Sequence, residues 1–325
     1  MIKVLKSNNP VNFILMFVIM LALWSFKFIY MPQPTESYEH YSYIFPELGE
    51  SRMFQYISAV VALLVYYAFA FFIIKTNLDL SIVESAYQSP GIFYVIITGL
   101  YVNVQRILPE IFASMLLYMS VVSIFYSYKK FKAYGNCFDA GLLFGLSILL
   151  VYKFVIFLPL LIIALIIIRP FTLKELISLI MGIFCPLVIA GSIIYLYFDF
   201  SELLSTIYDT FSEYHIRINK YNLYIFLPVL ILSVIAIISK FVLNVSQNIF
   251  TRKAQNILIF YLFFAIIYFI SPFANNEQVI VFFAPLSLLL SYIFVNTGRI
   301  SGIILFWGVL LCMFFLQIIQ FKIIY

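Results

Sequence analysis

The chain has 325 residues, of which 65% are hydrophobic and only 10% are charged, and its mean hydropathy is +1.08. A soluble domain is about half apolar and about a quarter charged, so this composition excludes a water-soluble fold. The formal net charge of +5 comes from lysines and arginines scattered between apolar runs. That pattern sets the orientation of a membrane protein and does not indicate binding to nucleic acid.

The apolar residues occur in runs of about 18 to 25, the length a helix needs to cross roughly 30 Å of hydrocarbon at about 1.5 Å per residue. A β-barrel would show short alternating segments, whereas the run Val60–Ile74 is continuous. We therefore predict an all-α, polytopic transmembrane protein, with residues 1–325 forming a single transmembrane domain of about 11 spans. The predicted spans are about 11–30, 53–74, 91–107, 110–127, 141–152, 154–168, 175–198, 222–240, 256–271, 278–295 and 301–319.

Lysines and arginines fix the predicted topology, because cytoplasmic loops of membrane proteins are enriched in them. Lys3 and Lys6 place the N-terminus in the cytoplasm, and Arg169 falls on the same side only if 141–168 crosses the membrane an even number of times. This favours two short helices that meet near Lys153 over one long tilted helix. The other basic residues predicted to be cytoplasmic are Lys75, Lys129, Lys130, Lys132, Lys174, Lys240, Arg252, Lys253 and Arg299.

The same topology places two long, tyrosine-rich and net acidic loops outside, at about 31–52 and 199–221. In the first loop, Glu36 and Glu39 are three residues apart and would share one face of a short helix. Such carboxylates could bind a divalent cation or act as a general base on a sugar hydroxyl. The alternative is that they are solvated charges that keep the loop outside.

The second outer loop has apolar residues at helical spacing over 203–211, which predicts an amphipathic helix in the membrane interface or packed against neighbouring spans. His215 and Arg217 follow it and could contact a phosphate. The alternative for Arg217 is a side chain that reaches from the membrane boundary to the headgroups.

Other polar positions interrupt the apolar runs. Lys153 lies at the turn of the predicted helix pair, where it could meet a phosphate or simply extend to the headgroups. Arg106 and Glu110 flank a proline and are spaced for a local ion pair, which could line a cavity or only stabilise a turn. Pro285 lies inside the predicted span 278–295 and indicates a kink.

The sequence lacks the motifs that are typical of several classes of enzyme. The sequence contains no P-loop, G-x-S-x-G, H-E-x-x-H, dinucleotide-binding glycine pattern or C-x-x-C. The three cysteines are far apart and lie in or beside apolar runs, so we expect them to be buried apolar residues rather than metal ligands. No cofactor is therefore predicted with certainty, and a divalent cation at the outer-loop carboxylates is the open alternative.

The segment Gly141-Leu-Leu-Phe-Gly-Leu-Ser-Ile-Leu-Leu-Val-Tyr-Lys153, followed by Phe157-Leu-Pro-Leu-Leu161 and Arg169, resembles the short-helix pair of the GT-C glycosyltransferases. The segment Asn276–Leu290 is similar to a later span of the same superfamily. The whole chain also resembles a family of uncharacterised Bacteroidota inner-membrane proteins. The GT-C resemblance implies sugar transfer from a polyprenyl-phosphate donor at the outer membrane face.

On that resemblance, Glu36 or Glu39 would be the catalytic base or metal ligand, and Lys153, Arg106, Arg217 and His215 would bind the phosphate. The sequence departs from the GT-C pattern in three ways: the first outer loop has no Asp, Glu277-Gln278 replaces a basic residue, and a soluble outer domain is absent. The alternative function is a non-enzymatic scaffold or partner subunit of a cell-envelope complex, bound to other membrane proteins. A transporter is less favoured, since the predicted spans show no inverted repeat.

Overall fold

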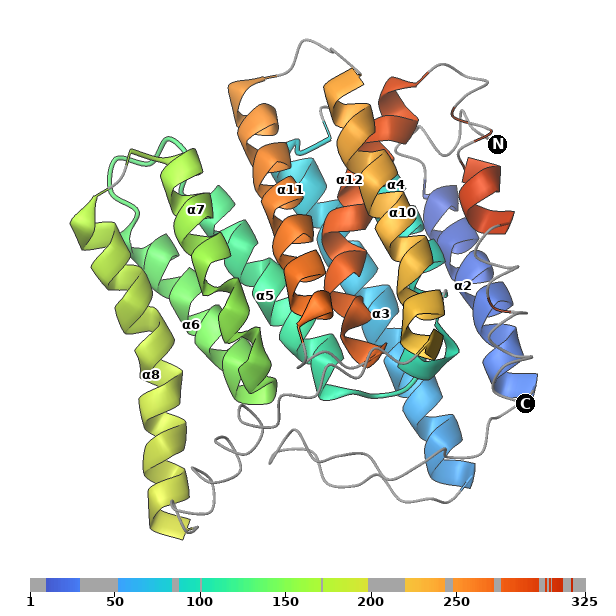
Figure 1. Cartoon of the computed structure of the whole chain (residues 1–325), viewed down its shortest axis with the longest axis horizontal. Helices are drawn as coiled ribbons and strands as arrows, with labels where there is room; N and C mark the ends of the chain where they lie inside the picture. The colour runs from blue at the N-terminus through green and yellow to red at the C-terminus, as the bar shows by residue number, and fades with distance from the viewer. Residues whose placement is uncertain are drawn as a thin grey trace. The chain divides into compact units, whose positions relative to one another are not determined.

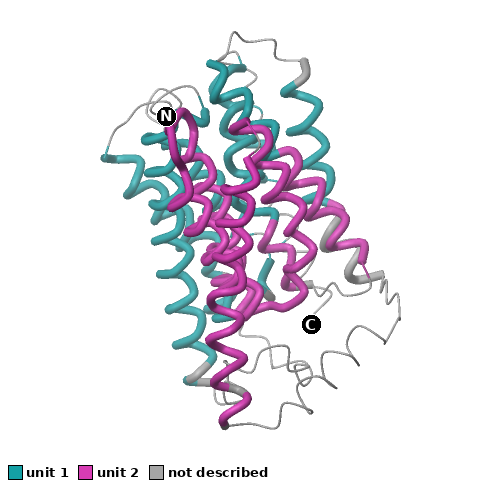
Figure 2. The backbone as a smooth tube through the Cα atoms, turned by 90° about the vertical axis from the view of Figure 1, so that its left-hand side faces the viewer, with its two compact units in different colours: residues 1–108, 228–258, 282–325 teal, residues 109–227, 259–281 magenta. Residues whose placement is uncertain are grey.

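The computed structural model describes residues 10–29, 52–83, 88–99, 101–170, 172–197, 220–242, 248–271 and 276–297, with isolated positions between 302 and 317. Over these residues the chain forms α- and 3-10 helices and no β-strand (Figure 1). They group into two compact units (Figure 2), which are considered one at a time. Unit 1 comprises 1–108, 228–258 and 282–325, and unit 2 comprises 109–227 and 259–281. The expectation of one transmembrane domain stays a prediction.

Each predicted span up to residue 295 overlaps a helix, although the span 91–107 is α-helical only to Thr98, and the all-α class is confirmed for the described residues. The helices are α2 Val11–Ile29, α3 Arg52–Leu80, α4 Ser89–Thr98, α5 Pro109–Phe125, α6 Tyr134–Leu150, α7 Leu158–Ile168, α8 Leu173–Tyr197, α10 Lys220–Val242, α11 Ile249–Ile270 and α12 Phe283–Asn296. Three short 3-10 helices lie between them: η1 Val102–Val104, η2 Tyr152–Phe157 and η3 Asn276–Phe282.

Among the described residues, four segments are long and apolar enough to cross a membrane by themselves: Gln55–Leu80, Leu173–Ile193, Ile249–Ile270 and Glu277–Asn296. The apolar segments of the remaining helices are 10 to 17 residues long over the residues described. A segment of that length falls short of the roughly 20 residues that span hydrocarbon. The structure is that of an integral membrane protein, and the figure of about 11 crossings stays a prediction.

Unit 1 is built around the short helix α4, every residue of which is buried. Pro90 starts this helix, where a missing N–H costs nothing, and the Ser89 hydroxyl shares a hydrogen bond with Ser291 of the buried helix α12. Helices α2 and α3 pack against α4, and the hydroxyl of Tyr67 in α3 donates to the Phe13 carbonyl of α2 at 3.1 Å. The core of unit 1 thus combines helix packing with short polar links.

Three described basic residues of unit 1 that were predicted to share one membrane side, Lys75, Lys240 and Arg252, lie toward one end of it. Thr251 of α11 donates to the Ser81 carbonyl at 3.1 Å, just after the end of α3. The ammonium of Lys240 bonds the Asn256 side chain and lies close to Arg252. Lys75 is fewer than two turns before Ser81. The prediction from loop charge that these three residues lie at the same end is therefore correct within unit 1.

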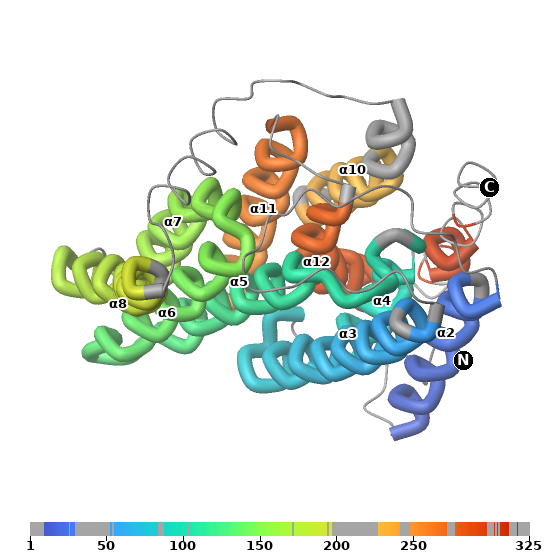
Figure 3. Tube along the Cα trace, turned by 90° about the horizontal axis from the view of Figure 1, so that it is seen from below, coloured from blue at the N-terminus to red at the C-terminus, as the bar shows by residue number. Residues whose placement is uncertain are grey.

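Unit 2 is a packed set of helices in which α6 lies between α5 and α8 (Figures 1 and 3). The hydroxyls of Ser120 and Ser147 cross to the carbonyls of Ala140 and Ala113 at 2.7 and 2.8 Å, which pins α5 antiparallel to α6. Interhelical hydrogen bonds of this kind hold membrane helices together where the hydrophobic effect does not.

Small residues set the crossing of α6 over α8. A Cβ on Gly141 would overlap the Leu179 carbonyl, and a Cβ on Gly182 would overlap the Phe138 carbonyl. Gly145 faces the Ile183 carbonyl in the same way. The G-x-x-x-G spacing on α6 therefore lets the two backbones touch, as in many membrane helix pairs.

The stretch 141–168 is two helices rather than one. Val151 has an extended backbone that ends α6, η2 follows, and Pro159 occupies the first turn of α7. Arg169, at the end of α7, bonds the carbonyl of Ser127, which follows α5. Residues on both sides of the helix pair thus lie at one end of unit 2, which confirms the hairpin that the charges predicted.

The predicted kink at Pro285 takes a different form. The chain is a 3-10 helix over η3, and α12 begins at Phe283, so Pro285 lies in the first turn of an α-helix. A proline is tolerated there, because first-turn N–H groups have no partner within the helix. The span is divided between two helix types and is not bent within one.

The glycine contact predicts a stability difference between two conservative substitutions. Gly141→Ala should destabilise the protein by about 1–3 kcal/mol, because the new methyl group collides with backbone that cannot move aside. Gly191→Ala in α8 is the control, since nothing lies within 4 Å of its Cβ position. It should be neutral or stabilising by up to about 1 kcal/mol. Thermal unfolding of the purified variants in detergent measures both, and equal effects would contradict the close crossing.

Candidate functional site

The predicted site residues fall into three groups. Glu36, Glu39, His215 and Arg217 lie outside the described residues. Arg106 belongs to unit 1 and Lys153 belongs to unit 2.

Lys153 is buried, with 4% of its surface exposed, in the 3-10 helix η2. Its ammonium lies 6.0 Å from the centre of the neighbouring Tyr152 ring, within cation–π range. A charge at membrane depth costs roughly 3 kcal/mol on insertion scales, so such residues usually mark a functional site.

Tyr268 of α11 brings further polar groups to the same end of unit 2. Its ring packs edge-on against Phe154 and Phe157 of η2, with ring centres 5.6 and 5.5 Å apart. Glu110 and Tyr152 lie near enough to Tyr268 to interact with it electrostatically. Glu110 is only 3% exposed and starts α5, so it is a buried carboxyl group rather than a surface charge.

The tyrosine hydroxyls of this cluster are unusual. Those of Tyr261 and Tyr268 are buried and form no hydrogen bond with the described part of the chain. A buried hydroxyl without a partner costs roughly 1–3 kcal/mol. Lys153, Glu110, Tyr152, Tyr261 and Tyr268 thus lie on η2 or on the helices whose side chains approach it, and they are termed here the η2 cluster.

The sequence revealed only part of this cluster. Lys153 stood out because it interrupts an apolar run, but Glu110 was interpreted as the local partner of Arg106. Tyr268 lies in an ordinary aromatic stretch of α11, and one of 25 tyrosines carries no distinguishing pattern. The run of Tyr, Phe and Ile around it gave no signal of a site.

Arg106 follows η1 in unit 1. The backbone N–H of its neighbour Ile107 donates to the Ser58 hydroxyl of α3 at 2.9 Å. Lys27, in the last turn of α2, lies close enough for the two positive charges to interact. Lys27 stands near the end of a predicted span, where basic residues are common, so its position in the sequence gives no signal of a site.

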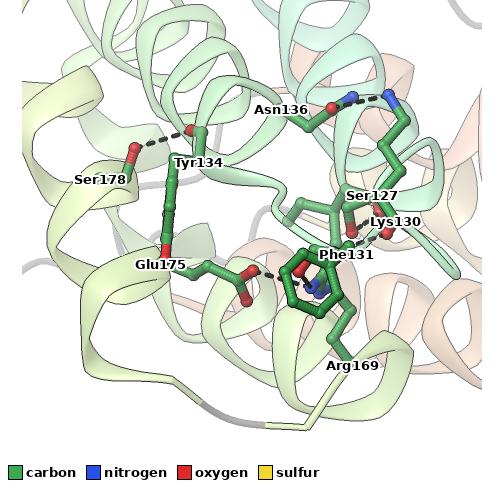
Figure 4. A network of polar contacts seen from close by, with 9 residues as sticks. Ser127, Lys130, Phe131, Tyr134, Asn136, Arg169, Glu175 and Ser178 are labelled. Carbon is green, nitrogen blue, oxygen red and sulfur yellow. Dashed lines mark hydrogen bonds and ion pairs between the residues drawn. The ribbon is translucent and has the colours of Figure 1, made fainter.

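The opposite end of unit 2 carries a different polar network (Figure 4). The Nη2 atom of Arg169 lies 3.0 Å from the Oε1 atom of Glu175, and both side chains are largely buried. Arg169 also donates to the Ser127 carbonyl at 2.9 Å, while Ser178 donates to the Tyr134 carbonyl at 2.7 Å. These bonds join the ends of α5, α6, α7 and α8, so their role is to hold the bundle together.

Within the described residues, no group of three or more His, Cys, Asp or Glu side chains could hold a metal ion. Cys137 is buried and Cys185 partly buried, and both are free thiols. The carboxylates predicted to bind a divalent cation, Glu36 and Glu39, lie outside the described residues.

A family model matches residues 1–325, which is the whole chain, and its description is a family of unknown function, DUF6427. The chain belongs to the DUF6427 family. No curated protein and no solved structure matches it. Membership in a family of unknown function agrees with the resemblance to an uncharacterised membrane-protein family. The GT-C resemblance stays an expectation.

The Arg169–Glu175 pair predicts a characteristic pattern in a double-mutant cycle. Arg169→Gln or Glu175→Gln alone should destabilise the protein by about 3–5 kcal/mol, because each leaves a buried charge unpaired. The double substitution should cost clearly less than the sum of the two. Lys130→Gln, which removes an exposed bond to Asn136, should change stability by less than about 1 kcal/mol. Additive costs in detergent unfolding would contradict a buried pair.

Proposed function

We propose that this DUF6427 protein is a GT-C-like glycosyltransferase that takes its sugar from a polyprenyl-phosphate carrier at the outer leaflet of the bacterial inner membrane. Glu36 or Glu39 acts as base, or as ligand of a divalent cation. Lys153, Arg106, Arg217 and His215 are the candidates that bind the donor phosphate. The N-terminus is cytoplasmic in this proposal.

One observation supports the proposal most: the η2 cluster buries Lys153 and Glu110 at the same end of unit 2. Burying an ammonium and a carboxyl group is costly in a membrane protein, and such residues persist mainly where function needs them. A lipid phosphate reaches a protein from within the bilayer, so a cation held at membrane depth is placed to meet it. The phosphate negative charge would in turn lower the cost of keeping Lys153 charged.

The two ends of unit 2 differ in how far their polar groups are hydrogen-bonded, which supports a reaction at only one membrane face. The Arg169 end is joined by backbone-directed bonds and a buried ion pair. In the η2 cluster, by contrast, the buried hydroxyls of Tyr261 and Tyr268 form no hydrogen bond with the described residues. Spare polar groups next to a cation are what a bound phosphate or sugar hydroxyl would use.

A specific feature favours the second candidate function, a scaffold or partner subunit of an envelope complex. Helix α8 carries apolar side chains that are more than half exposed, including Met181, Phe184 and Val188. Gly191 and Ser192 lie on the same helix, and small residues favour close packing between membrane helices. This face could receive another membrane protein in place of lipid.

The proposed enzyme predicts that the η2 cluster is needed for transfer. Lys153→Gln and Glu110→Gln should each lower sugar transfer from a polyprenyl-phosphate donor by about 100-fold or more, the usual size of a lost acid–base or phosphate contact. Transfer is measured in membranes that contain equal amounts of each variant. Lys130→Gln, at the other end of unit 2, is the matched control. Unchanged transfer in the Lys153 and Glu110 variants would reject a role for the cluster.

The outer-loop carboxylates predict a separate outcome. Replacing both Glu36 and Glu39 by alanine should abolish transfer at an unchanged protein level, because either one can serve as base or cation ligand. The control is alanine at both Glu47 and Glu50 of the same predicted loop, which should leave transfer intact. Normal surface glycans in the first strain would count against the enzyme. Recovery of stable protein partners after purification in mild detergent would then favour the scaffold.

A further inference from the structure

The loop 126–134, which joins α5 to α6 in unit 2, carries the most exposed large apolar side chain of the described residues. Phe131 is 94% exposed. Lys129 and Lys132 stand on either side of it along the chain and are also exposed. Tyr126 and Tyr134, at the two ends of the loop, are 38% and 40% exposed. Tyrosines at the ends of apolar helices are typical of the boundary between membrane and water.

Hydrogen bonds hold the backbone of this loop in one conformation (Figure 4). Arg169 donates from Nη1 to the Ser127 carbonyl at 2.9 Å and from Nη2 to the Phe131 carbonyl at 3.5 Å. The ammonium of Lys130 donates to the side-chain oxygen of Asn136 at 2.9 Å, which ties the loop to the start of α6. A ligand would therefore meet a loop that is already ordered, which lowers the entropy cost of binding.

Lys129 has a backbone conformation that lysine rarely adopts. Its φ angle is 59°, in the left-handed region that glycine and asparagine favour. Its ammonium lies 5.4 Å from the centre of the Tyr128 ring, within cation–π range. The backbone at this position therefore favours another residue type, and the positive charge is what lysine adds.

Positive charge predominates at this end of unit 2. Lys174, the second residue of α8, is exposed, as are the lysines of the loop. It adjoins Glu175, whose carboxylate is buried and paired with Arg169. The other described carboxylate near this end is that of Asp139, in the second turn of α6. The exposed lysines outnumber the exposed carboxylates, so this surface is complementary to an anion.

The combination of lysines with an exposed aromatic ring selects among anions. A phospholipid presents negative charge and hydrocarbon side by side, and the loop presents lysines around a phenylalanine. An acidic protein surface would match the lysines but would offer the Phe131 ring no hydrocarbon. The loop also joins two apolar helices of an integral membrane protein, so lipid headgroups are its immediate neighbours.

We propose that the loop 126–134 binds an anionic phospholipid at the membrane surface. Lys129 and Lys132 bond the headgroup, and the Phe131 ring packs against the hydrocarbon beneath it. Lys130 has no part in this contact, because its ammonium is bonded to Asn136. Lipid binding here does not depend on the proposed glycosyltransferase activity.

The test measures the affinity of the first lipid bound to the full-length protein in detergent, by native mass spectrometry. Phosphatidylglycerol is the anionic probe and phosphatidylcholine the zwitterionic one. Lys129→Asn together with Lys132→Gln should weaken phosphatidylglycerol binding by about 25-fold, since each lysine near an anionic surface contributes about fivefold. Phosphatidylcholine should bind as before. Asparagine suits the left-handed conformation, so the unfolding temperature without lipid should not fall.

The aromatic ring predicts a different pattern. Phe131→Ser should weaken the binding of both lipids by about 10-fold, because it removes an apolar contact that does not depend on the headgroup charge. Phe131→Trp should restore binding of both, since tryptophan favours the membrane interface.

Lys75→Gln together with Lys253→Gln removes two lysines from unit 1 and is the matched control, which should bind phosphatidylglycerol normally. The proposal is overturned if the Lys129 and Lys132 variant binds phosphatidylglycerol as tightly as the wild type, or if the control loses as much affinity. Equal binding of the two lipids by the wild type would also overturn it. Displacement of phosphatidylglycerol by polyglutamate at equal concentration would overturn it in favour of an acidic protein partner.

Discussion

The free energy of placing a charge in hydrocarbon is the constraint on which the rest of this structure depends. The bilayer core offers no water to solvate an ammonium or a carboxylate, so most charged side chains must lie at helix ends. Within unit 1, Lys75, Lys240 and Arg252 lie toward one end, and in unit 2 Arg169 lies beside the turn that follows α5. Lys27, Glu110 and Lys153 are buried exceptions to this rule.

The same constraint explains the irregular backbone of the described chain. Exposed backbone groups are tolerated at membrane depth only where protein or a polar cavity surrounds them. Before α5, α7 and α12 the chain passes through a short 3-10 helix, and a proline stands in the first turn of each α-helix. Arg106, Lys153 and Glu277 lie in or beside these 3-10 segments. The breaks in helical structure thus coincide with the polar positions that interrupt the apolar runs.

The sequence predicted those features of the fold that a single physical rule determines. Run length predicted the helices, and the distribution of basic residues predicted that 141–168 is a hairpin, because Arg169 falls on the cytoplasmic side only after an even number of crossings. Packing between residues far apart in the chain could not be predicted from the sequence. Glu110 of α5 lies near enough to Tyr268 of α11 to interact with it electrostatically, although the two are far apart along the chain. The sequence marked Glu110 only as a local partner of Arg106, and it did not distinguish Tyr268 from its aromatic neighbours. The burial of Lys27 within unit 1 was likewise not predicted from the sequence.

The proposed site requires that the basic ends of both units face the cytoplasm and that residues 31–52 face outward. Cysteine labelling in intact cells tests this most directly, in a protein whose own Cys137, Cys185 and Cys312 are replaced by alanine. We predict that a membrane-impermeant maleimide labels Glu39→Cys in intact cells, and that it labels Lys130→Cys and Arg252→Cys only after permeabilisation. Labelling of Lys130→Cys and Arg252→Cys from opposite sides, or of Glu39→Cys only from the cytoplasm, would contradict the account.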